Sequence, residues 1–253
     1  MKRALALELP LMTLLAAMLA AAMPLAAGQF EWSWDALNHH VYLGMTAEQP
    51  RWDLDVIPAS YQTYQYPYLY WPVYRLSLLD VSGVVAGAIW SAFQAAWLMP
   101  PVWWLCMRLL PNAGAVLPGW LERCLGCLLA FMSMVVLAGL QTTANDLLAA
   151  VPLLWALALA AHPVRSLRRS AAAAALVGVA AAFKLSNGLY FPLLLVWWWV
   201  PGDGWHLAAR RGLAMALGVS LGFLVPYAPW GWQLWRLTGN PFYPFLADYF
   251  GRG

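Results

Sequence analysis

Long apolar runs alternate with short polar segments along this chain of 253 residues. A run of roughly 20 uncharged residues makes a helix long enough to cross ~30 Å of hydrocarbon. Backbone amides inside lipid must find their hydrogen-bond partners within the segment, so these runs must be helical. The pattern therefore predicts an all-α, polytopic integral membrane protein with about seven transmembrane helices.

The polar segments divide the chain, treated as one domain over residues 1–253, into spans and loops. The predicted spans are 9–27, 82–107, 124–142, 147–164, 171–183, 189–200 and 212–226. Residues 28–80 form a large first outer loop, whose Tyr- and Pro-rich part is expected to lie along the membrane interface as helices. Residues 227–253 form the last outer loop. Residues 184–188 are interpreted as an outer turn between two short spans, with one long span around a buried lysine as the alternative.

The first apolar segment has two interpretations. Its basic start and its small residues near Ala27 are typical of a cleavable signal peptide, whereas its length and the spans behind it favour a retained anchor. In both cases the basic start stays inside and residue 28 emerges outside. Most of the 14 Lys and Arg then fall on the inner side. The prediction is a multi-pass protein of a bacterial inner (plasma) membrane with a cytoplasmic N-terminus.

Composition narrows the function classes. Hydrophobic residues make up 63% of the chain and charged residues 10%, against about 25% charged residues in soluble domains. The absence of a dense basic patch argues against nucleic-acid binding. The odd number of cysteines argues against a disulfide framework. The C-x-x-C of Cys124 and Cys127 is interpreted as helix packing, with zinc or redox use as the alternative.

A polar stretch, E-W-S-W-D-A-L-N-H-H at residues 31–40, follows the first apolar segment and carries the most chemistry for its length. Asp35 is a candidate general base, because a carboxylate can take the proton of an attacking hydroxyl. The alternative is that Asp35 caps a helix beginning at Ala36. Asn38 and His39 are candidate substrate-binding residues in the same stretch.

Two further candidates lie at the predicted outer ends of later spans. Asp146 is a second candidate catalytic carboxylate, with a first-turn position that complements the helix dipole as the alternative. Lys184 lies in a mostly apolar neighbourhood and is a candidate contact for a phosphate leaving group. Snorkelling of its side chain to the interface is the alternative.

Residues of the first outer loop could also bind substrate or metal. Tyr61 and Gln62 offer a flat ring and an amide suited to a sugar, and Arg75 could contact phosphate or pair with a surface acid. Carboxylates bind divalent cations, so Asp53 and Asp55 with His40 are candidate metal ligands. Adjacent histidines on a helix point about 100° apart, which argues against His39 and His40 sharing one ion.

Five segments occur in an order that matches a known family. In chain order they are S-W-D-A-L-N-H-H after the first span, D-V-I-P-A-S-Y-Q-T-Y-Q-Y-P-Y-L-Y-W-P, N-D at the head of the fourth span, F-K-L-S-N-G, and T-G-N-P-F-Y-P-F. This layout resembles the GT-C superfamily of polytopic glycosyltransferases, close to its mannosyltransferase-like and arabinofuranosyltransferase-like bacterial members. Where such families carry paired acids, W-D-A-L-N has a single carboxylate, which leaves metal dependence open.

The resemblance implies an inverting hexosyl- or pentosyltransferase that uses a polyprenyl-phosphate-linked sugar. The acceptor would be a hydroxyl of a glycan, lipid or protein at the outer face of the bilayer, with Asp35 as the base. No cofactor is implied beyond a possible divalent metal. A transporter or flippase of lipid-linked sugars is the second hypothesis, although transporters carry ionisable residues near mid-membrane and often show internal repeats. A third is a truncated, non-catalytic member, because the chain stops in an outer loop without a closing span.

Overall fold

The protein is described by a computed structural model that covers residues 2–30, 33–55, 58–110, 118–162, 166–199 and 204–250. All regular secondary structure in these ranges is helical, which confirms the predicted all-α class. Glu31 and Trp32 of the polar stretch, and the predicted span ends at 163–164 and 200, lie outside the described residues.

The helices differ widely in length. In chain order they are α1 (Lys2–Ala27), η1 (Ala36–His40), α2 (Val41–Thr46), η2 (Ser60–Tyr64), α3 (Trp71–Ser77), α4 (Gly83–Leu109), α5 (Gly119–Phe131), α6 (Met134–Leu140), α7 (Asp146–Ala160), α8 (Leu167–Phe183), η3 (Leu185–Tyr190), α9 (Pro192–Trp198), α10 (Trp205–Thr238) and α11 (Ala247–Phe250). Length and apolar composition make α1, α4 and α10 candidate membrane spans, and the bent pair α5–α6 a fourth. These helices are compatible with the predicted membrane protein.

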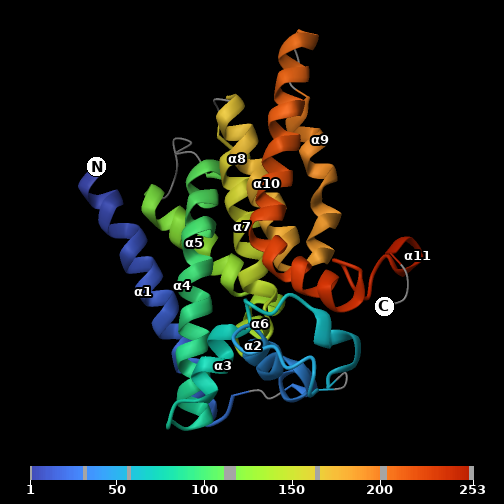
Figure 1. The fold of residues 1–253 in the computed structure, drawn as a ribbon. Coiled ribbons are helices and arrows are strands. Elements are labelled where there is room, and N and C mark those ends of the chain that lie inside the picture. The colour runs from blue at the N-terminus through green and yellow to red at the C-terminus, as the bar shows by residue number, and fades with distance from the viewer. Residues whose placement is uncertain are drawn as a thin grey trace.

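The long helices form a bundle with the short loop helices gathered at one end (Figure 1). α1 packs on α4, α4 packs on α7, and α8 lies between α7 and α10. The segment that carries α2 and α3 lies where α1 ends and α4 begins, while the N-terminus lies toward the other end (Figure 1). The bundle therefore has two distinct ends, and the segment between α1 and α4 occupies one of them (Figure 1).

Small residues bring α8 and α10 into backbone contact. A Cβ added at Gly222 would lie 2.0 Å from the carbonyl oxygen of Ala175, and one at Gly178 would lie 2.2 Å from that of Val219. Such residues let two helices approach closely where lipid offers no hydrophobic driving force. The Ala-rich composition of α8 is thus explained by this contact.

Two predicted segments have different bounds in the structure. The predicted span 124–142 is divided into α5 and α6, which meet at an angle of 71°. Ser133 begins α6 by accepting a hydrogen bond from the backbone N–H of Val136. α10 continues through Pro226 and Pro229 to Thr238, so the segment that follows it begins near Gly239 instead of at the predicted residue 227. Neighbouring groups can satisfy the carbonyls that a proline frees inside a membrane helix.

Candidate functional site

An ion pair joins the start of α7 to the end of α8. Lys184, directly after α8, donates from Nζ to Oδ1 of Asp146, the first residue of α7. Both side chains remain accessible, with exposed fractions of 39% for Lys184 and 61% for Asp146. Asn187 supports this turn, because its side-chain amide donates to the carbonyls of Ala149 and Ala180, at 3.2 and 3.0 Å.

Asp35 lies on the same loop-covered end of the bundle, just before η1. Its backbone is helical, its side chain forms no capping hydrogen bond, and Ser33 Oγ instead accepts from the N–H of Ala36 at 3.1 Å. The capping alternative is therefore not what the Asp35 side chain does. Its side chain is 57% exposed, and Oδ1 lies 3.8 Å from Nδ1 of the buried His39.

A buried polar cluster connects the segment between α1 and α4 to the segment before α7. Nδ1 of His40 lies 2.7 Å from Oγ1 of Thr143, and the ring of Tyr70 stacks on His40 at a centroid distance of 4.7 Å. Gly44 makes room for this contact, since a Cβ there would lie 2.5 Å from the carbonyl oxygen of Tyr70. Nδ1 of His39 is buried without a hydrogen-bond partner among the described residues.

The negative charges of Asp35 and Asp146 both act on the rings of this cluster. Burial, followed by the negative charges of Asp146 and Asp35, raises the pKa of Tyr70. Burial and the adjacent His39 lower the pKa of His40 to about 4, against the opposing effect of the same two carboxylates. Both carboxylates thus act on the same buried rings, although they are far apart in the sequence.

A pocket of about 500 Å³ opens beside Lys184. Its polar side chains come from the segment between α1 and α4, the start of α7 and the turn after α8, and aromatic rings supply most of the remaining wall. The lining residues are Tyr61, Gln62, Tyr64, Gln65, Tyr66, Asn145, Phe183, Lys184, Leu185, Ser186, Tyr227, Tyr243, Pro244 and Phe245. Flat rings, amides, hydroxyls and one cation form a surface that suits a sugar linked to phosphate.

The structure therefore brings together several of the predicted site residues. Tyr61, Gln62 and Lys184 line the pocket, and Asp146 pairs with Lys184 at its edge. Asp35 lies outside the lining, on the neighbouring cluster. Asn38, His39 and His40 all lie on η1, where Asn38 is half-buried and the two histidines are buried.

Other predicted residues are engaged elsewhere. Arg75 pairs with Glu48 at 3.3 Å and lines a separate surface groove of about 430 Å³, so it does not reach the Lys184 pocket. Asp55 pairs with Arg51 at 3.3 Å and accepts a hydrogen bond from Tyr42, whereas Asp53 is exposed on a turn. Over the described ranges, no three His, Cys, Asp or Glu side chains are placed to hold a metal ion.

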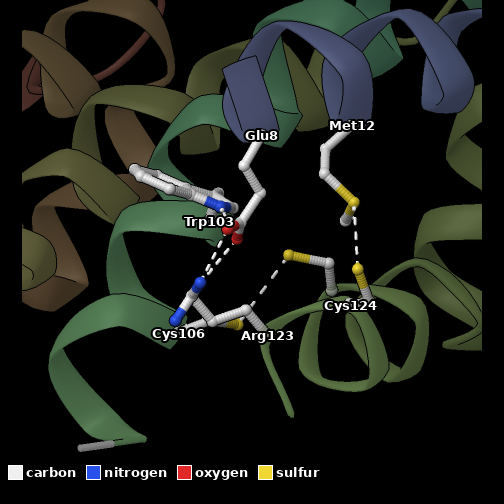
Figure 2. Close-up of polar contacts among 7 residues, drawn as sticks. Glu8, Met12, Trp103, Cys106, Arg123 and Cys124 are labelled. Carbon is white, nitrogen blue, oxygen red and sulfur yellow. Dashed lines mark hydrogen bonds and ion pairs between the residues drawn. The ribbon is translucent and has the colours of Figure 1, made fainter. Parts of the chain in front are cut away.

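Sequence reasoning missed some pocket residues and one whole cluster. Tyr243 reaches the pocket from the T-G-N-P-F-Y-P-F segment, and Thr143 reaches His40 from the Q-T-T-A-N-D segment; both segments were recognisable but their contacts were not. At the opposite end of the bundle, Arg123 binds the Glu8 carboxylate through Nε and Nη2, at 2.6 Å each (Figure 2). A lone acid inside an apolar run and a base near another helix start were the available signals.

Comparisons with known proteins give no match from which a function could be inferred. No protein-family model matches the chain, and no match is found among curated proteins or among solved structures. The resemblance to GT-C glycosyltransferases consequently rests on the order of segments in the sequence. The chemistry available to the chain is that of Asp35, Asp146, Lys184 and the pocket beside Lys184.

Proposed function

We propose that this protein is a membrane glycosyltransferase that moves a sugar from a polyprenyl-phosphate carrier to an acceptor hydroxyl at the outer face. One observation carries the proposal: Asp35, Asp146 and Lys184 gather at one end of the bundle, and Lys184 lines a pocket of about 500 Å³. The rings and amides of that pocket fit a sugar, and its cation fits a phosphate. The donor and the acceptor are the partners this site requires.

The topology that goes with this function has seven crossings. α1, α4, the α5–α6 pair and α10 supply four, and α7, α8 and η3–α9 supply three shorter ones. Counted in this way, the first outer loop and the turn at Lys184 lie on the same side of the membrane. The arrangement in Figure 1 supports this count, because the loop helices gather where α1 ends and α4 begins.

The proposed roles follow from exposure and charge. The exposed Asp35 carboxylate takes the proton of the acceptor hydroxyl as the hydroxyl oxygen forms a bond to the anomeric carbon. The bond between that carbon and the phosphate oxygen breaks, and the phosphate leaves with the electron pair. Lys184 releases Asp146, binds the phosphate and stabilises the negative charge of this leaving group. Asp146 thereby holds the lysine in place between turnovers.

The test is the Asp35→Asn variant, with Asp80→Asn as the matched control. Asp80 is an exposed acid near the end of the same outer loop and lies away from the pocket. Membranes with equal amounts of each variant are given labelled polyprenyl-phosphate mannose, arabinofuranose or glucose, and transfer to endogenous acceptors is measured. Transfer should fall by about 100-fold or more in Asp35→Asn, the range seen when an acid–base group is lost. Wild-type transfer in Asp35→Asn would refute the proposal.

The same experiment separates transfer from transport of lipid-linked sugars. In vesicles, a flippase makes the labelled donor accessible on the other leaflet without consuming it. A transferase consumes the donor and labels an acceptor. Movement of intact donor that is insensitive to Asp35→Asn would favour transport and contradict the proposal.

A further inference from the structure

Four sulfur atoms lie close together where α1, α4 and α5 meet (Figure 2). Sγ of Cys127 on α5 lies 3.9 Å from Sγ of Cys106 on α4, and Sγ of Cys124 lies 3.5 Å from Sδ of Met12 on α1. All three cysteines are free thiols. Within this group, the contact of Cys106 with Cys127 is the one between two thiols on different helices.

The ion pair between Glu8 and Arg123 lies next to these sulfur atoms and fixes the position of α5 relative to α4. Glu8 binds Arg123 of α5 and also accepts a hydrogen bond from the indole of Trp103 on α4, at 2.8 Å. Trp103 and Cys106 lie three residues apart on α4, and Arg123 and Cys127 lie four apart on α5, so each pair shares a helix face. The carboxylate that joins Trp103 to Arg123 therefore also keeps the two sulfur atoms opposite each other.

Gly126 lets the two helices approach at this point. A Cβ at position 126 would lie 2.9 Å from Sγ of Cys106 and 3.1 Å from Cδ1 of Leu110. The α5 backbone is thus in contact with the Cys106 side chain. The two sulfur atoms need to move only roughly 2 Å closer to reach the length of a disulfide bond, which rotation of the side chains can supply.

We infer that Cys106 and Cys127 form a reversible disulfide bond between α4 and α5 in response to a two-electron oxidant such as a peroxide. Cys106 is partly exposed and Cys127 is buried, so the oxidant meets Cys106 first. The Cys106 sulfur attacks the peroxide and becomes a sulfenic acid, releasing water or an alcohol. The Cys127 sulfur then attacks the Cys106 sulfur and displaces water. Two thiols are oxidised to one disulfide, the peroxide is reduced, and a thiol reductant reverses the step by exchange.

The bond would lock α5 against α4 and leave Cys124 as a free thiol. Cys124 lies one turn before Cys127 on the same helix, but its sulfur contacts Met12 of α1. With the predicted orientation this end of the bundle faces the cytoplasm, where reductants keep such pairs as thiols until an oxidant arrives. The inference concerns the inner end of the bundle and does not depend on glycosyl transfer.

Counting free thiols in the full chain tests the inference. Purified protein in detergent is treated with hydrogen peroxide, denatured, and labelled with a maleimide-linked polyethylene glycol that shifts its mobility on a gel. Of the three cysteines, two should lose their label, and dithiothreitol should restore both. Peptide mass spectrometry should identify a Cys106–Cys127 cross-link within one chain.

Cysteine variants make the outcome specific. Cys124→Ser should fall from two labels to none on oxidation, whereas Cys106→Ser should keep two labels. In Cys127→Ser no thiol is left to resolve the sulfenic acid of Cys106, so this variant should form no cross-link within the chain. The loss or retention of labels in each variant is measured against its own untreated sample, so a change in folding does not imitate the result. Three labels after oxidation of the wild type, a Cys124–Cys127 bond, or a bond between two chains would overturn the inference.

Discussion

Two ion pairs lie at opposite ends of the bundle, and they differ in their exposure and in the number of hydrogen bonds that their charged groups form. The Glu8–Arg123 pair has exposed fractions of 13% and 10%, two hydrogen bonds of 2.6 Å, and the Trp103 indole as a further donor. The Lys184–Asp146 pair has exposed fractions of 39% and 61% and a single contact between its charged groups. The first pair is enclosed by three helices, whereas the second lies at the edge of a pocket.

The difference separates a structural pair from one that can exchange partners. A buried charge that loses its partner is left unsatisfied in a medium of low dielectric constant, so the Glu8–Arg123 pair must stay closed. An exposed pair contributes little to stability, because water and salt compete with it. Lys184 can therefore release Asp146 for a phosphate at small cost, which is what the proposed reaction needs.

The largest expected effect comes from breaking the buried pair. Arg123→Met should lower the free energy of unfolding by about 3–5 kcal/mol, because it leaves the Glu8 carboxylate buried without its cation. Chemical denaturation in detergent measures this loss. The double variant Glu8→Leu with Arg123→Leu should recover much of it, since neither charge then remains. Additive losses in the double variant would show that the pair does not act as a unit.

The next largest expected effect is a dependence of stability on pH, which arises at the end of the bundle that carries His40. The lowered pKa of His40, about 4 against 6.5 for an ordinary histidine, means that the unfolded chain binds a proton that the folded protein does not. Stability should therefore fall as pH drops from about 6.5 to 4, by up to about 3 kcal/mol. Thermal unfolding in detergent across this pH range measures the change.

Two histidine variants show where that pH dependence arises. His40→Gln should flatten the decline between pH 6.5 and 4, whereas His206→Gln, at an exposed position near the start of α10, should leave it unchanged. Equal declines in wild type and His40→Gln would assign the pH dependence to other groups. That result would also contradict the inferred electrostatic effect of the two carboxylates on the buried His40 ring.

The sequence predicted the helical class and most long helices because apolar runs and their flanking charges are local signals. α4 begins and ends within two residues of the predicted span, and α1 ends at the predicted Ala27 but begins earlier, at Lys2. The break between α5 and α6 was missed, because Ser133 is one polar residue in an apolar run and capping depends on the three-dimensional path. The length of α10 was missed because Pro226 and Pro229 usually end a helix in water, where no neighbouring segment covers the freed carbonyls.

The candidate site was predictable residue by residue, but its contacts were not. Asp35, Asp146 and Lys184 were candidates because they are charged residues at the ends of apolar runs, which is a local property. The contact of Lys184 with Asp146 depends on how α8 is placed against α7, and the place of Asp35 depends on the path of the segment between α1 and α4. Arg75 was a candidate for the same local reason, because it is a positively charged residue in the segment between α1 and α4. In the structure it pairs with Glu48 on another surface.

The smallest expected effect, on stability, belongs to Lys184, and it is the sharpest test of the comparison. Lys184→Met should change the free energy of unfolding by less than about 1 kcal/mol, because the pair it breaks is exposed. In the proposed reaction the same variant should lower transfer by about 10- to 100-fold, since a phosphate contact is worth more in the transition state than an exposed ion pair is in the resting protein. Denaturation and transfer assays on the same membranes measure both. A large loss of stability with normal transfer would make Lys184 a structural residue like Arg123, and the contrast between the two ends would no longer hold.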